Sequence, residues 1–144
     1  MWSMLRLLAL ALWLGALVGF AFIFAPTAFA QIGPTPTFAT TIADTLALLM
    51  RTGDWCGIVA VAVTALAHLD RRRTAAIIVA CIALAIILGF VETQNIIPHM
   101  QTTLPGSAAF AQLHQRSSAV YAIIALAVFV AFGFSSYRCS QAAE

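Results

Sequence analysis

A few ionisable side chains interrupt an otherwise apolar chain, and these could bind an ion or a small solute. Glu92, Asp54, Arg51 and Arg116 stand inside or beside long apolar runs. An isolated charge within a membrane costs about 2.5–3.5 kcal/mol on insertion scales, so such groups normally face a bundle interior and have a partner. The cheapest arrangement therefore pairs the two carboxylates with the two arginines.

Helical spacing places further polar groups on shared faces. The last apolar segment repeats polar or aromatic residues at i, i+3, i+4 and i+7, namely Phe110, His114, Ser117, Ser118 and Tyr121. Arg51 shares a face with Asp54, and Glu92 aligns with Asn95. We expect one polar pocket in which Glu92 and His114 titrate and the arginines set the charge. Its predicted ligand-binding residues are Glu92, His114, Asp54, Arg51, Arg116, Ser117, Tyr121 and Asn95.

Metal, haem and enzymatic chemistry are weaker alternatives. His99, His114 and Glu92 could approach one another and hold a divalent metal, and the two histidines could hold a haem iron. No spacing such as HxxxH supports this, so no cofactor is predicted. Neither GxSxG nor HExxH occurs, and no phosphate-binding glycine loop is present. The sequence therefore does not favour an enzyme.

The composition indicates the elements that must position these residues. The chain has 144 residues, of which 62% are hydrophobic and 8% charged, whereas soluble domains carry about 25% charged residues. A net charge of +2 gives no reason to expect nucleic acid. Because a membrane crossing takes roughly 20 helical residues, we predict one all-α, integral-membrane four-helix bundle over residues 1–144. The expected helices are 4–29, 40–69, 74–97 and 108–137.

The first apolar segment could be a secretion signal, since Ala28, Phe29 and Ala30 have the small-x-small form of a cleavage site. However, the run from Leu7 to Phe24 is longer than the roughly 7–15 residues of a signal-peptide core. We therefore expect a retained membrane helix.

The arginines predict the orientation of the bundle. With four crossings, Arg6, residues 70–73 and Arg138 fall on one side, and the connections 31–40 and 98–107 contain no Lys or Arg. The positive-inside rule then places both termini in the cytoplasm. We expect a multi-pass protein of the bacterial inner membrane, with its polar layer in the outer leaflet and His68 at the lipid headgroups.

Two functions remain open for that layer. It could bind an ion or small solute in a minimal transporter or its accessory. Alternatively, it could hold together the helices of a structural or assembly subunit that has a membrane-protein partner. Gly15 and Gly19 also stand four residues apart, a pattern that lets helices approach closely. We expect that pair to pack within the bundle, with Trp13 filling a neighbouring groove.

The order of several motifs resembles the transmembrane protein 205-like family, a group of four-helix membrane proteins of unknown function. In the first half the resemblance rests on Trp13, Leu14, Gly15, Pro26 and Phe29. In the second half it rests on Glu92, Pro98, Met100, Phe110, Leu113, His114, Ser117 and Tyr121. The resemblance implies four crossings, and it singles out Glu92 and His114 as the polar pair. A eukaryotic relative is associated with drug resistance, which implies handling of small molecules.

Overall fold

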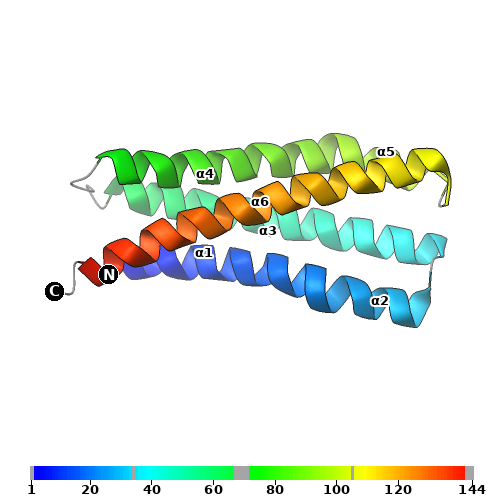
Figure 1. The fold of residues 1–144 in the computed structure, drawn as a ribbon, viewed down its shortest axis with the longest axis horizontal. Coiled ribbons are helices and arrows are strands. Elements are labelled where there is room, and N and C mark those ends of the chain that lie inside the picture. Colours follow the sequence, from blue (N-terminus) through cyan, green and yellow to red (C-terminus); the bar gives the residue numbers. More distant parts are fainter. Residues whose placement is uncertain (1, 34, 67–71, 105, 142–144) are drawn as a thin grey trace.

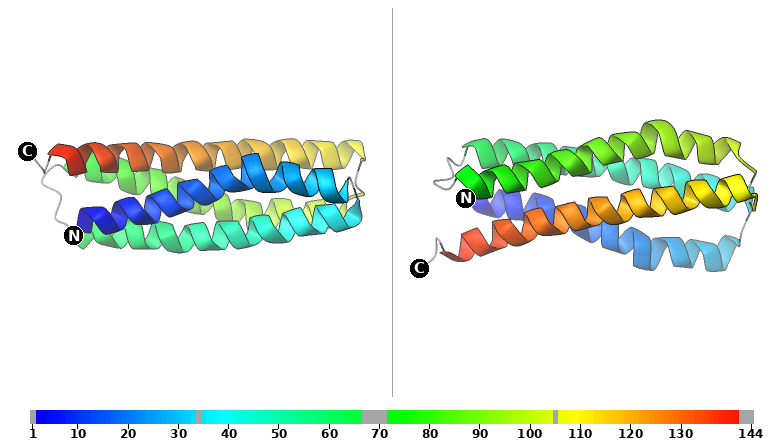
Figure 2. Two further views of the ribbon diagram at one scale, coloured as in Figure 1. Left: turned by 90° about the horizontal axis from the view of Figure 1, so that it is seen from below. Right: turned by 45° about the horizontal axis from the view of Figure 1, so that its top comes forward.

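The chain folds into long helices that run side by side, up and down the molecule (Figures 1 and 2). A computed structural model describes residues 2–33, 35–66, 72–104 and 106–141. The first rod joins α1 (Trp2–Gly19), the π-helical turn η1 (Phe20–Phe24) and α2 (Ala25–Ile32). The second is α3 (Pro36–Leu66). The third joins α4 (Arg72–Val91), the π-helical turn η2 (Glu92–Ile96) and α5 (Ile97–Thr102), and the fourth is α6 (Ala108–Gln141).

Within the described residues, four helices are long and apolar enough to cross a membrane. Large apolar side chains such as Leu12, Phe90 and Leu126 are exposed on the outside of the bundle, where lipid would cover them. These features confirm the predicted all-helical class and indicate a multi-pass membrane protein.

Both ends of the described chain lie at one end of the bundle (Figure 1). We call the half nearest Trp2 and Gln141 the terminal half, and the half containing α2 and α5 the distal half. The rods form a ring of neighbours, since α1 and α4 each pack against both α3 and α6. Of the residues used to predict orientation, Asp70 and Arg71 lie outside the described residues, and so does His68, which was predicted to lie at the lipid headgroups. Orientation in the membrane stays a prediction.

The first and third rods continue past the points at which the sequence predicted their ends. They reach Ile32 and Thr102 rather than residues 29 and 97. Each contains a proline, Pro26 or Pro98, which lacks an N–H and crowds the carbonyl four residues earlier. In both rods a π-helical turn comes just before the proline, with hydrogen bonds from Ala25 N–H to Phe20 O and from Ile97 N–H to Glu92 O. The wider turn accommodates the proline, and the helix continues.

Side-chain caps set the starts of the other two rods. Thr35 Oγ1 accepts a hydrogen bond of 3.2 Å from Phe38 N, and Pro36 follows as the first helical residue. This combination is favoured at helix N-termini, and it starts α3 earlier than the predicted residue 40. Ser107 Oγ accepts 3.1 Å from Phe110 N in the same way, so that α6 starts at 108 as predicted.

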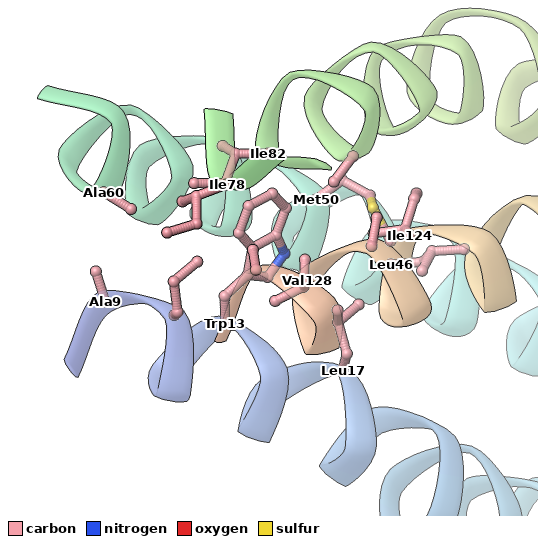
Figure 3. Close-up of a cluster of buried hydrophobic side chains, with 14 of the residues drawn as sticks. Ala9, Trp13, Leu17, Leu46, Met50, Ala60, Ile78, Ile82, Ile124 and Val128 are labelled. Atoms are coloured by element: carbon pink, nitrogen blue, oxygen red, sulfur yellow. The ribbon is translucent and has the colours of Figure 1, made fainter. Parts of the chain in front are cut away.

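The core of the terminal half is built around Trp13 (Figure 3). Its ring occupies a groove on α3 in which Gly53 and Gly57 leave room: a Cβ atom on Gly53 would lie 2.1 Å from Trp13 Nε1. The expectation for Gly15 and Gly19 is wrong, because a Cβ on either would meet nothing within 4 Å. The small residues that permit close approach are on α3, one helix away from the predicted pair.

Candidate functional site

The distal half contains a cavity of ≈ 660 Å³. Its walls come from η1, α2, α3, α5 and α6, and it extends from the middle of the bundle to the connections near Thr35 and Gly106. Aromatic rings form much of the wall. Those from the first two rods are Phe20, Phe29 and Phe38, and those from α6 are Phe110 and Tyr121.

The aromatic residues pack against one another and shape the wall. Phe29 meets Phe38 edge to face with ring centroids 5.5 Å apart, which joins α2 to α3. Phe20 lies 5.9 Å from the ring of Tyr121 and so joins η1 to α6. The cavity is therefore bounded by α2 and α5, the distal ends of the two proline-containing rods, and by α3 and α6.

Three of the predicted ligand-binding residues line this cavity: His114, Ser117 and Tyr121. They follow one face of α6 at the predicted helical spacing. The His114 ring stacks on Phe110 with centroids 6.4 Å apart. The Tyr121 hydroxyl donates a hydrogen bond to the backbone carbonyl of Leu17.

Glu92 stands directly behind the wall. Its side chain is completely buried, with 0% exposure, and its Oε1 accepts a hydrogen bond from the Ser117 hydroxyl. Its second oxygen, Oε2, has no hydrogen-bond partner among the described residues. Glu92 is also the first residue of η2, and π-helical turns occur frequently at functional sites. Ser117 is thus the link between the cavity and a buried carboxyl group.

Asp54, on α3, does not line the cavity. Its Oδ1 is buried, without a hydrogen-bond partner in the described part of the chain. A Cβ atom on Gly89, one helical turn before Glu92, would lie 3.5 Å from that oxygen. Asp54 and Glu92 therefore approach the same stretch of helix, but only Glu92 is bonded to a residue of the cavity wall.

The predicted pairing of these carboxyl groups with arginines is wrong. Within the described ranges no ion pair joins Asp54 or Glu92 to Arg51 or Arg116, and both arginines are exposed. The reason is the rotation of α3 and α6 about their axes. Inward positions on α3 are occupied by Met50, Gly53 and Gly57, so the side chain at position 51 points outward. Asn95, the remaining predicted residue, is exposed as well.

The three residues considered for a metal site are not brought together. His99 is exposed, and its Nδ1 lies 2.6 Å from the backbone carbonyl of Asn95 on its own helix. In the part of the chain that the structure describes, no group of three or more His, Cys, Asp or Glu side chains could hold a metal ion. His99, His114 and Glu92 therefore do not form the considered site.

Sequence reasoning missed two polar groups at the distal edge of the cavity. Gln101 lines it and donates from Nε2 to Asp44 Oδ1 at 3.3 Å, and Thr35 lines it beside its helix cap. It also missed the aromatic wall, because Phe20 and Phe29 are part of an apolar run that predicts a membrane helix and nothing more. Helical periodicity on the 36–50 segment was the signal that could have indicated an inward-facing Phe38 and Ala39.

Comparison with known proteins places the chain in a family without assigning a function. No curated protein and no solved structure matches it. The resemblance to the transmembrane protein 205-like family receives no support from these comparisons and stays a prediction. The profile of one family, described as a domain of unknown function (DUF4149), matches residues 8–105, which is more than half of the chain. The protein therefore belongs to the DUF4149 family.

Proposed function

We propose that this protein binds a small, largely apolar solute in the distal cavity and acts as a minimal transporter or as an accessory to one. The observation that supports the proposal is the cavity itself. Its volume of ≈ 660 Å³ falls within the roughly 300–1,000 Å³ typical of small-molecule sites. Apolar and aromatic walls with a few polar groups are likewise typical of such sites. These walls suit an organic solute better than a bare ion, which needs several oxygen ligands.

The proposal includes a location. Positive-inside reasoning places both termini in the cytoplasm, and the distal cavity then faces the outer side of a bacterial inner membrane. A solute could reach the cavity from the outer side or from the outer leaflet, past the connections near Thr35 and Gly106.

Filling the cavity tests the proposal. Ala39 lines the cavity on α3, whereas Ala65 on the same helix is exposed and lines none of the wall. We expect purified wild-type protein in phosphatidylcholine nanodiscs to bind 1-naphthylmethanol saturably in equilibrium dialysis, above the uptake of protein-free discs. Ala39→Trp should abolish this binding, and Ala65→Trp should leave it unchanged. Equal binding by both variants, or none by wild type, would contradict the proposal.

A structural role is the second candidate, and one contact favours it. The hydrogen bond between Ser117 and Glu92 joins the third rod to α6 in the distal half of the bundle. In a structural subunit this bond would serve to hold the third rod and α6 together. In that case Glu92→Gln and Ser117→Ala would lower the melting temperature, and no probe binding would depend on the space beside Ala39.

A further inference from the structure

Two hydroxyl groups in the cavity wall, those of Ser117 and Tyr121, use their hydrogen-bond donors within the protein. Ser117 donates its hydroxyl proton to Glu92, and Tyr121 donates its own to Leu17 O. A hydroxyl has a single donor but two acceptor lone pairs. Both side chains therefore have only acceptor capacity left for a ligand. Gln101 directs one of its two amide N–H groups to Asp44, with 3.3 Å between Nε2 and Oδ1.

The formal charges behind this wall are acidic. Glu92 is bonded to Ser117, and Asp44 is bonded to Gln101. No Lys or Arg side chain is among the described residues that line the cavity. The basic side chain that does line it, His114, is stacked on Phe110 about one turn nearer the distal end than Ser117.

The aromatic wall adds a second attraction for positive charge. Ring faces carry a negative quadrupole potential that attracts cations. Phe20 and Tyr121 both line the cavity, and their ring centroids are 5.9 Å apart. Acceptors, an acidic group and aromatic rings thus occur together on one side of an apolar space.

We infer that the ligand is an amphipathic ammonium ion, with an apolar or aromatic body in the cavity and a protonated amine donating to Ser117 Oγ and Tyr121 Oη. Glu92, through its bond to Ser117, compensates the charge of the amine. This inference rests on the proposed solute-binding function and adds the chemical class of the solute.

Three probes with one body and different head groups test the inference in the unmodified protein. They are the amine 1-naphthylmethylamine, the alcohol 1-naphthylmethanol and the carboxylate of 1-naphthylacetic acid. Binding is measured at neutral pH in zwitterionic phosphatidylcholine nanodiscs. Because hydrogen bonds to charged groups are stronger than neutral ones, we expect the amine to bind about tenfold more tightly than the alcohol. The carboxylate should show no saturable binding, because it would bring its negative charge to the acceptor oxygens of Ser117 and Tyr121, with Glu92 behind them.

Variants then identify the source of the preference. Glu92→Gln and Ser117→Ala should each reduce the ratio of amine to alcohol affinity toward one. Asp54→Asn is the matched control, because it neutralises another partly buried carboxyl group that neither lines the cavity nor bonds to its wall. It should leave the ratio near the wild-type value.

The outcomes separate the inference from the function on which it rests. If all three probes bind with similar affinity and Ala39→Trp abolishes that binding, solute binding stands and the ammonium inference is overturned. An amine preference that survives in both Glu92→Gln and Ser117→Ala also overturns it. If no probe shows binding that Ala39→Trp removes, the proposed function itself fails.

Discussion

The packing of Trp13 depends on the absence of side chains at two positions of α3. Its ring occupies the space that side chains at Gly53 and Gly57 would need. The interior between α1 and α3 is therefore specified by a large residue on one helix and two glycines on the other. Glycine is required here for space, since both positions lie in regular helix.

Gly53→Ala should destabilise the bundle. The new Cβ would fall 2.1 Å from Trp13 Nε1, so the ring or the backbone must shift, and overpacking of this kind costs about 1–3 kcal/mol. Gly15→Ala is the control, because a Cβ there meets nothing within 4 Å. Thermal unfolding in mild detergent should show a lower melting temperature for Gly53→Ala than for Gly15→Ala. Equal melting temperatures would contradict this packing.

Ser117→Ala should also destabilise the protein, for a different reason. It leaves Glu92 Oε1 without its hydrogen bond in a fully buried position, and an unsatisfied buried polar atom costs about 1–3 kcal/mol. Ser118→Ala, at the exposed neighbouring position, should stay within about 0.5 kcal/mol of wild type. The measurement is denaturant unfolding of both variants in the same detergent, and a larger loss for Ser118→Ala would count against the bond.

Among the helices, the two proline-containing rods share one construction. A five-residue π-helical turn is followed by one residue and then by Pro26 or Pro98. Both units border the cavity, since Ala25, Phe29, Ile97 and Met100 all line it. A simple stop at each proline would have left the distal half without two of its walls.

The start of α6 depends on a cap that can be removed and replaced. Ser107→Ala removes the acceptor for Phe110 N–H, which should cost about 1 kcal/mol of stability. Ser107→Asp restores a capping oxygen and should recover most of the loss. Melting temperatures of the two variants provide the comparison. If the melting temperature of Ser107→Asp is no higher than that of Ser107→Ala, the cap does not set the start of α6.

The bundle as a unit is longer than a bilayer is thick. Its four candidate spans contain 30 or 31 residues each, or about 45 Å of helix, against a hydrocarbon core of about 30 Å. The exposed polar residues Asn95 and Arg116 lie toward the distal ends of their rods. We therefore place the excess length on the distal side.

Cysteine labelling tests that placement and the predicted orientation together. In a variant with the native cysteines replaced by alanine, Arg116→Cys should react with a membrane-impermeant maleimide added outside intact cells. Leu126→Cys, which is 62% exposed but ten residues deeper along α6, should stay unlabelled because lipid covers it. Labelling of Arg116→Cys only after permeabilisation would mean the opposite orientation.

The sequence was sufficient for the number and approximate extent of the helices, because a run of apolar residues long enough to cross a bilayer has few alternatives. It was also sufficient to place His114, Ser117 and Tyr121 on one face, since that follows from the helical repeat. It could not show how far the first and third rods continue. Pro26 and Pro98 end an ordinary helix, and the π-helical turns that accommodate them form in the context of the packed bundle.

The rotation of each helix about its axis is decided by packing and could not be predicted from the sequence. In a soluble protein the polar face of a helix identifies the outside, but here the lipid side is as apolar as the interior. The pattern around Arg51 and Asp54 therefore did not reveal that one faces out and the other in. That choice follows from Trp13 fitting against Gly53 and Gly57. The same packing separates the arginines from Glu92 and leaves that carboxyl group bonded to Ser117 at the wall of an apolar cavity.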